Sequence, residues 1–222
     1  MASNFVHLHV HSEYSLLDGA ARIKDLVAKA KEYEMTSIAL TDHGVMYGAM
    51  DFYKECKANG IKPILGVEGY VINGDITEKD LGRLEERYHL ILLAENEEGY
   101  KNLIKLVSES HTEGFYYKPR MNKELLRKYS KGIICMSACL AGEVSSLILK
   151  GELDKARSAA REYKEIFGDN NFFLEVQANT LPEQKLVNNE LRKIGNELGI
   201  KLVATNDIHY IEFEDWKVQD IL

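Results

Sequence analysis

Apolar residues rich in β-branched side chains gather in seven short segments, and most of the gaps between them show a helical repeat of apolar positions. The segments predicted as strands are Phe5–Val10, Ser37–Thr41, Pro63–Ile72, His89–Ala94, Gly132–Ser137, Phe172–Gln177 and Lys201–Thr205. Helices are predicted over 22–33, 46–59, 97–109, 142–149, 152–167 and 183–198, with helix ends at Gly60, Gly168 and Gly199. Strands that alternate with helices indicate parallel strands joined by crossovers, hence an α/β fold. Seven such strands would close into a (β/α)7 barrel, in which functional residues lie at the C-terminal ends of the strands.

Two segments depart from this alternation. Asn73–Arg87 is polar and charged, and we predict an exposed excursion between two strands, where disorder or an insertion is most expected. Residues 212–222 are predicted to form an amphipathic helix in which Phe213, Trp216 and Leu222 could pack. Because this helix stops without a cap or a polar tail, we expect residues 1–222 to be a single domain cut from a longer protein.

Three histidines alternate along the first predicted strand, in the run His7-Leu8-His9-Val10-His11-Ser12. Side chains two apart on a strand share a face, so the histidines would point one way and the apolar residues between them the other way. Packing alone rarely places three imidazoles on one face, because each ring N–H needs a hydrogen-bond partner. Imidazole is the commonest protein ligand for zinc and related ions, so the trio predicts a metal site. The alternative is one or two ordinary core histidines on an edge strand.

Composition and charge narrow the classes of protein. The 222 residues are 45% hydrophobic and 28% charged, which suits one globular domain with a full core. No apolar run approaches the ~20 residues that cross a bilayer, and no signal-peptide pattern is present, so we expect a cytoplasmic protein without a membrane partner. Three cysteines, Cys56, Cys135 and Cys139, suggest no disulfide framework, as in a reducing compartment. The net charge of −7 has the wrong sign for bulk attraction to nucleic acid, so a DNA substrate would have to be presented by something else.

Other residues able to bind metal ions lie beside the ends of predicted strands. They are Asp18, His43, Glu68, His89, Cys139, Asp207 and His209. In a barrel these residues would meet at one mouth, together with the opening histidines. Seen alone, Asp18 suits an ordinary turn, His43 a polar loop, and Cys139 a small buried hydrophobe.

Three of these positions, Glu68, Asp207 and His209, are harder to explain by ordinary packing. Glu68 stands in an apolar strand, where an unpaired buried carboxylate would be costly, so it needs a cation. Asp207 and His209 are spaced two apart beyond a strand end, which aims both at one site if the local chain stays extended.

Five longer runs of residues, several of which contain these candidates, are specific enough to indicate a protein family. They are Phe5-Val6-His7-Leu8-His9-Val10-His11-Ser12, Tyr14-Ser15-Leu16-Leu17-Asp18-Gly19, Leu40-Thr41-Asp42-His43-Gly44, Gly114-Phe115-Tyr116-Tyr117-Lys118-Pro119-Arg120 and Ala204-Thr205-Asn206-Asp207. On these runs the whole chain resembles the polymerase and histidinol phosphatase family, called PHP, and more narrowly the N-terminal PHP domains of bacterial DNA polymerase III alpha subunits. The resemblance implies a distorted, TIM-like barrel of seven strands that carries three metal ions.

The resemblance also implies nine metal ligands, and the chain has a suitable residue at each position. The ligands of the first metal would be His9, His11, Glu68 and Asp207. The second metal, reached by a bridging Glu68, would be completed by His89 and Cys139. The third metal would be held by Asp18, His43 and His209. His7 stands where many relatives have an acidic residue and is left out, and Asp42 would orient a ligand.

Divalent metals bridged by a carboxylate suit phosphoester hydrolysis, because bound water becomes hydroxide near neutral pH and the metals hold the phosphoryl oxygens. A thiolate beside imidazoles favours zinc, while the carboxylates would also accept manganese or magnesium. The resemblance implies a 3′ to 5′ proofreading exonuclease in which Glu68, Asp207 and His11 are catalytic. Its partners would be a DNA 3′ end, presented by the rest of the polymerase, and other replicase subunits. Two alternatives stay open: a metal-stabilised structural domain without catalysis, and a free-standing phosphatase for a small phosphate ester.

One further run interleaves aromatic residues with two cations, over Phe115–Arg120. Such a run could stack a base or steady a phosphate at the mouth of the barrel, which makes Lys118 and Arg120 candidate substrate contacts. More often a run of this kind packs a loop.

Overall fold

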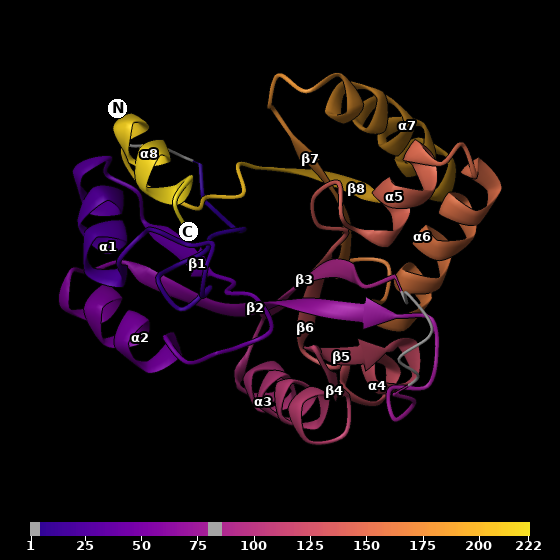
Figure 1. Ribbon diagram of the computed structural model, residues 1–222, viewed down its shortest axis with the longest axis horizontal. Helices are drawn as coiled ribbons and strands as arrows, with labels where there is room; N and C mark the ends of the chain where they lie inside the picture. The colour runs from indigo at the N-terminus through magenta and orange to yellow at the C-terminus, as the bar shows by residue number, and fades with distance from the viewer. Residues whose placement is uncertain (1–4, 80–85) are drawn as a thin grey trace.

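The computed structural model describes residues 5–79 and 86–222. Its helices and strands, in chain order, are α1 (Ile23–Glu32), β1 (Ser37–Leu40), α2 (Ala49–Ala58), β2 (Lys62–Ile72), β3 (Tyr88–Ala94), α3 (Glu97–Thr112), β4 (Phe115–Tyr116), β5 (Lys118–Asn122), α4 (Lys123–Tyr129), β6 (Ile133–Met136), α5 (Glu143–Leu149), α6 (Leu153–Phe167), β7 (Phe172–Gln177), α7 (Pro182–Leu198), β8 (Lys201–Thr205), the 3-10 helix η1 (Phe213–Asp215) and α8 (Trp216–Gln219). The strands form one curled sheet in the order β4-β5-β2-β3-β6-β7-β8. β1 lies outside this order and pairs with the first half of β2, from Lys62 to Leu65. Helices α1 and α2 lie beside β1, and α3 to α7 cover the rest of the sheet (Figure 1). The predicted α/β class is confirmed.

The opening segment closes the curled sheet into a distorted ring. On one side, the carbonyls of His7 and Val10 accept hydrogen bonds from the amides of Ala39 and Thr41. On the other side, the segment exchanges two backbone hydrogen bonds with Ile208, beyond the end of β8. The predicted regular strand Phe5–Val10 is wrong, however, because only one isolated bridge, Val10 to Ile208, forms there. The chain turns at Asp207 (φ 52°), so the neighbouring segment is not extended and cannot offer a ladder.

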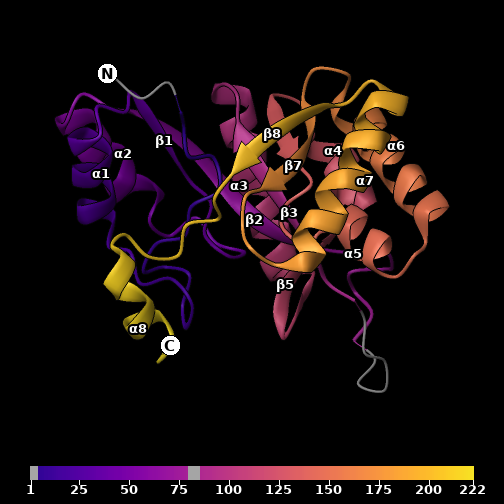
Figure 2. The same ribbon diagram turned by 90° about the horizontal axis from the view of Figure 1, so that it is seen from above.

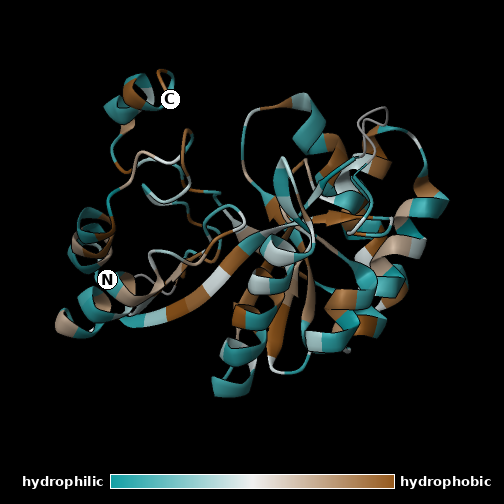
Figure 3. Ribbon diagram, turned by 60° about the horizontal axis from the view of Figure 1, so that its bottom comes forward, coloured by the Kyte–Doolittle hydropathy of each residue, from teal (hydrophilic) through white to brown (hydrophobic). Residues whose placement is uncertain are grey.

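Seven segments each send side chains into the interior of the ring. The interior cluster consists of Leu8, Ala39, Ile64, Ile91, Leu93, Ile134, Met136, Ala138, Phe173 and Val203. Alternate residues of the same strands face outward: Leu90, Leu92 and Leu174, for example, pack in the larger core beneath α3 to α7. Figure 3 shows this division, with hydrophobic residues gathered on the strands and polar residues on the outer helix faces. The residues that follow the interior cluster on the parallel strands, and those that precede it on the antiparallel β3, therefore line one end of the ring.

One strand runs against the predicted direction. β3 pairs antiparallel with both β2 and β6, whereas β1, β2, β6, β7 and β8 form parallel pairs where they meet. A parallel pair needs a long crossover, usually a helix, and the described residues of the connection from β2 to β3, 73–79 and 86–87, form none. These residues are mostly exposed, as predicted for the excursion, while 80–85 of that prediction lie outside the described residues.

The remaining differences are short elements. The predicted helices over 22–33 to 183–198 are present with shifts of a few residues at their ends, but β4, β5 and α4 were not predicted. β5 was not predicted because it contains Pro119 and two cations, which are uncommon in strands. The proline is tolerated because β5 lies next to the edge of the sheet and pairs only briefly with β4. The predicted helix over 212–222 is reduced to η1 and α8. Within the described part of the chain, no helix is long and apolar enough to cross a membrane.

Candidate metal centre

Nine side chains of the types that bind metal ions converge at one end of the ring, from several strands and the loops that follow them. They are His9, His11, Asp18, His43, Glu68, His89, Cys139, Asp207 and His209. The antiparallel course of β3 is what delivers His89, because the start of β3 lies at the same end as the finishes of the parallel strands. Contacts of 3.8 Å or less link all nine into one continuous set.

The first group surrounds the imidazole of His9. Its Nε2 lies 3.1 Å from His11 Nε2, 3.1 Å from Asp207 Oδ1 and 3.2 Å from Glu68 Oε1. His11 Nε2 lies 3.3 Å from the same oxygen of Asp207. Both histidines are fully buried, and so is Glu68 except for 1% of its surface. Two ring nitrogens and two carboxylates thus share one small space, which is buried except on the side of Asp207.

The second group surrounds Glu68. His89 Nδ1 lies 3.0 Å from Glu68 Oε1, and His43 Nδ1 contacts Oε2. Cys139 Sγ lies 3.8 Å from His89 Nδ1. Because Glu68 also contacts His9, its two oxygens face three histidines from different elements. A carboxylate in this position is suited to bridging two cations.

The third group lies nearer the surface. Asp18 Oδ2 is 2.8 Å from His43 Nε2 and 3.1 Å from His209 Nε2. His11, His43 and His209 also offer ring nitrogens close enough to share one ion. His43 touches both Asp18 and Glu68, so it connects this group to the second one.

Hydrogen bonds behind two of the histidines fix which nitrogen carries a proton. Glu175 Oε1 lies 2.7 Å from His9 Nδ1, and a carboxylate only accepts, so His9 Nδ1 donates. Ser15 Oγ donates to Asp42 at 2.7 Å and therefore accepts from His11 Nδ1 at 3.0 Å. Asp42 thus acts on a candidate ligand through Ser15 rather than directly. Burial opposes a charge on His9, but Glu175 raises the pKa of its imidazole above the usual value. In the neutral form of each ring the Nε2 lone pair faces the cluster, as a metal ligand requires.

The cluster strongly favours positive charge between its carboxylates. Burial alone would raise the pKa of Glu68, but its bonds to three histidines hold that pKa well below the usual range. Burial likewise opposes ionisation of Asp207, yet His11 and His9 lower its pKa to about 2. Burial, helped by His9 and His43, lowers the pKa of His11 to about 4, so this imidazole is neutral at neutral pH. Ionised carboxylates beside a neutral imidazole form a ready donor set for a cation.

Buried polar atoms without hydrogen-bond partners indicate whether metal ions would fit in the cluster. Glu68 Oε2, Asp207 Oδ1 and His43 Nδ1 are buried and have no hydrogen-bond partner of acceptable geometry. Such atoms are costly unless something else binds them. Burial, with Glu68 and Asp207 nearby, also raises the pKa of the Cys139 thiol, which an adjacent metal ion would deprotonate. The nitrogen, oxygen and sulfur donors present here fit divalent ions, and zinc suits the set that includes Cys139.

Backbone strain accompanies three of the candidate ligands. Asp207 itself has a positive φ, and so do Leu17 and Ala138, which directly precede Asp18 and Cys139. This conformation is uncommon for residues other than glycine and persists where the surroundings impose it. The extended chain expected from Asp207 to His209 is therefore wrong, although both side chains do reach the cluster, with 3.5 Å between His209 Nδ1 and Asp207 Oδ1.

Some candidates lie elsewhere. His7 does not share the face of the other two histidines: it lines an apolar hollow with Leu26 and Ile38. Arg120 is buried, and its guanidinium donates to the carbonyls of Gly114, Ile76 and Glu78, so it holds the chain beyond β2 and is not presented to a substrate.

Lys118, by contrast, stays available beside the cluster. Its side chain is exposed, and its Nζ lies 5.3 Å from the ring centre of Tyr70. That ring in turn contacts His43 and His89. Of the two predicted substrate contacts, only Lys118 therefore keeps a cation near the candidate ligands.

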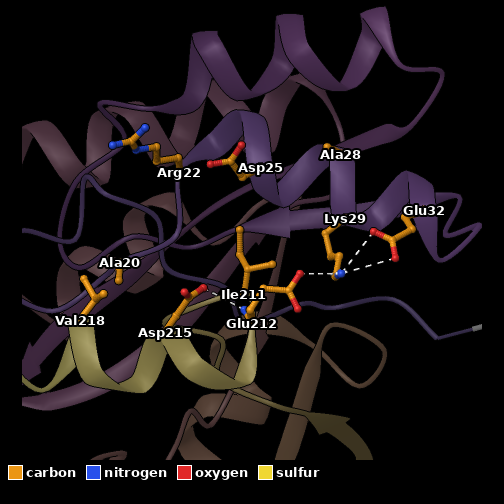
Figure 4. A pocket seen from close by; sticks show the side chains of 10 residues that line it. All are labelled: Ala20, Arg22, Asp25, Ala28, Lys29, Glu32, Ile211, Glu212, Asp215 and Val218. Atoms are coloured by element: carbon orange, nitrogen blue, oxygen red, sulfur yellow. Dashed lines mark hydrogen bonds and ion pairs between the residues drawn. The ribbon is translucent and has the colours of Figure 1, made fainter.

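The segment beyond β8 is anchored by one contact to α1 and by one contact to the cluster. Glu212 pairs with Lys29 of α1 at 2.6 Å, across the hollow between α1 and the C-terminal helices in Figure 4. Gln219 of α8 donates to Asp18 Oδ1 at 3.1 Å. Seen from above, this segment crosses from the end of β8 to the side of α1 (Figure 2). Next to it, a cavity of about 510 Å³ gives solvent access to Asp18, Asp207 and His209.

Comparison with known proteins agrees with this geometry. The PHP domain family profile matches residues 7–179. The chain belongs to the PHP domain family. The resemblance predicted from the sequence is thus confirmed, and so is the narrower one. This PHP domain is 52% identical to DNA polymerase III subunit alpha of Borreliella burgdorferi and 50% identical to that of Treponema pallidum, in each case over 99% of this chain. The chain spans 19% of the length of each of these relatives.

Solved structures share the fold of this PHP domain. An amidohydrolase from Chromobacterium violaceum, with bound sulfate and no metal, superposes with a TM-score of 0.59 at 13% identity, over 97% of this chain and 96% of that one. A two-domain protein from Bacteroides vulgatus that contains a predicted PHP-like metal-dependent phosphoesterase gives a TM-score of 0.52 at 16% identity, over 92% of this chain and 52% of that one. The distorted TIM-like barrel is therefore confirmed.

Proposed function

We propose that this chain is the PHP domain of a DNA polymerase III subunit alpha and that it hydrolyses phosphodiesters at a DNA 3′ end. The observation that carries this proposal is the single connected cluster of nine ligand-type residues, in which Glu68 Oε2, Asp207 Oδ1 and His43 Nδ1 are buried without hydrogen-bond partners. Similarity to polymerase subunits over 99% of the chain supports DNA as the substrate. The activity is a 3′ to 5′ proofreading exonuclease.

Three divalent ions, zinc in preference to manganese or magnesium, would be held in the groups described above. Such ions supply a hydroxide near neutral pH and positive charge for the phosphoryl oxygens. Glu68 keeps three histidines at fixed positions around its two oxygens. Asp207 and His11 share a contact of 3.3 Å, with the Nε2 lone pair of His11 turned toward the reacting region.

Substrate would enter where the cluster meets solvent. The cavity beside Asp18, Asp207 and His209 is large enough for a nucleotide, since ligand sites commonly measure ~300–1,000 Å³. The exposed ammonium of Lys118 is placed to attract a phosphate. Because the chain carries a net charge of −7, the rest of the polymerase would present the DNA, in the cytoplasm and together with other replicase subunits.

The test is nucleotide release by the full-length protein that carries this chain. We expect release from a 3′-labelled DNA with a mismatched end in the presence of zinc or manganese, and a loss of at least ~10²-fold in His11→Ala and in Asp207→Ala. Asp154→Ala, on the exposed face of α6, is the control and should keep full activity. Release that survives both ligand substitutions would contradict the proposal, and so would a metal-loaded protein that releases nothing.

A further inference from the structure

We propose that Glu175, which is not one of the nine candidate ligands, is a positioning residue for His9 and a source of negative charge for the metal centre. This inference rests on the proposed function. Sequence reasoning missed Glu175, although it has the same signature as Glu68, a carboxylate inside an apolar strand.

The contact between the two residues sets the direction of the His9 ring. Glu175 points into the ring from β7, and its Oε1 lies 2.7 Å from His9 Nδ1. Both side chains have no exposed surface. With Nδ1 donating to Glu175, the opposite nitrogen faces Glu68 and Asp207. A carboxylate behind a metal-bound histidine fixes its tautomer and raises its basicity, which strengthens the bond to the metal.

Glu175 is itself held by a neighbour on β7, by the end of β8 and by Ser137, which directly follows β6. Its Oε1 accepts from Gln177 Nε2 at 3.2 Å and from the hydroxyl of Thr205. Its backbone amide donates to Ser137 Oγ at 2.8 Å. Thr205 is the last residue of β8, two positions before Asp207. The support behind His9 therefore also fixes the strand end from which another candidate ligand emerges.

Simple core packing does not account for a carboxylate at this position. Burying an ion is costly unless opposite charge compensates, and within the described part of the chain Glu175 pairs with His9 rather than with a lysine or an arginine. Its second oxygen, Oε2, is buried without a hydrogen-bond partner. The carboxylates of Asp18, Glu68 and Asp207, with a Cys139 thiolate, do not neutralise three divalent ions. A further buried negative charge is therefore favourable next to them.

A matched pair of variants separates this role from packing. Glu175→Gln keeps the shape of the side chain and removes its charge. Glu143→Gln makes the same change at another buried carboxylate, which Asn73, Lys123 and Tyr163 hold through hydrogen bonds. Zinc affinity is measured on the purified protein by competition with a chelator, and the melting temperature of each metal-free variant is recorded alongside.

We expect Glu175→Gln to bind zinc about 10–100-fold more weakly than the wild type, and Glu143→Gln to match the wild type. Thr205→Val, which removes a donor to Glu175 without touching His9, should weaken zinc binding by a smaller factor even if Glu175→Gln folds poorly. Unchanged affinity in Glu175→Gln, or an equal loss in Glu143→Gln, would overturn the inference. A wild-type protein that binds no zinc would instead overturn the proposed function.

Discussion

Replacing Glu68 by alanine is expected to remove at least one bound metal equivalent and to slow 3′-nucleotide release by about 10²–10³-fold. The reason is the place of Glu68 among His9, His43 and His89, which makes it the common neighbour of two groups of candidate ligands. No other residue of the cluster contacts three histidines from three separate elements through one buried carboxylate. Metal content by plasma mass spectrometry and release from a labelled 3′ end measure the two effects.

Cys56→Ala provides the control for this experiment. Cys56 is a fully buried residue of α2, in a core cluster apart from the metal centre, so its substitution costs packing but should leave every metal in place. If Glu68→Ala binds as much metal as the parent protein does, Glu68 does not bridge two ions.

Removal of the metals is expected to lower the melting temperature by about 10 °C. Ions present at a thousand times their dissociation constant stabilise the fold by about 4 kcal/mol, and 1 kcal/mol corresponds to ~2–4 °C for a domain of this size. Because the pKa values of Glu68 and Asp207 are held low, both carboxylates stay ionised at neutral pH and repel each other once the cations leave. Calorimetry before and after chelation measures the shift.

Zinc added back to the stripped protein should restore the original transition, which separates reversible metal loss from damage. The same treatment of Asp207→Ala should produce a smaller shift, because one site is already impaired. A melting curve that chelation leaves unchanged would show that bound metal contributes nothing to this fold.

Much of the barrel could be predicted because residues on its strands alternate between the inside and the outside of the ring. Ile64, Gly66 and Glu68 alternate with outward-facing residues on β2, and the same period puts Phe173 and Glu175 inside on β7. The same alternation places His9 and His11 together in the cluster. Local periodicity thus predicted which residues would share the mouth of the ring.

Features set by pairing between distant segments could not be predicted in this way. The direction of β3 depends on its partners β2 and β6, although the lack of a predicted helix before His89 was an available signal. His7 leaves the face of His9 because the opening segment forms only scattered hydrogen bonds, which do not enforce a strand period. Arg120 looked like a surface cation because its carbonyl partners, at Ile76 and Glu78, lie far away in the sequence.

The most direct test of the metal centre is X-ray diffraction from zinc-grown crystals of the protein, recorded on both sides of the zinc absorption edge. We expect anomalous peaks inside the cluster, with nitrogen and oxygen ligands from the nine residues at ~2.0–2.2 Å and Cys139 Sγ at ~2.3 Å. We also expect that His9 Nδ1 remains bonded to Glu175 while Nε2 faces a peak. A map without anomalous peaks in the cluster, in which the same histidines and carboxylates bond directly to one another, would contradict the account.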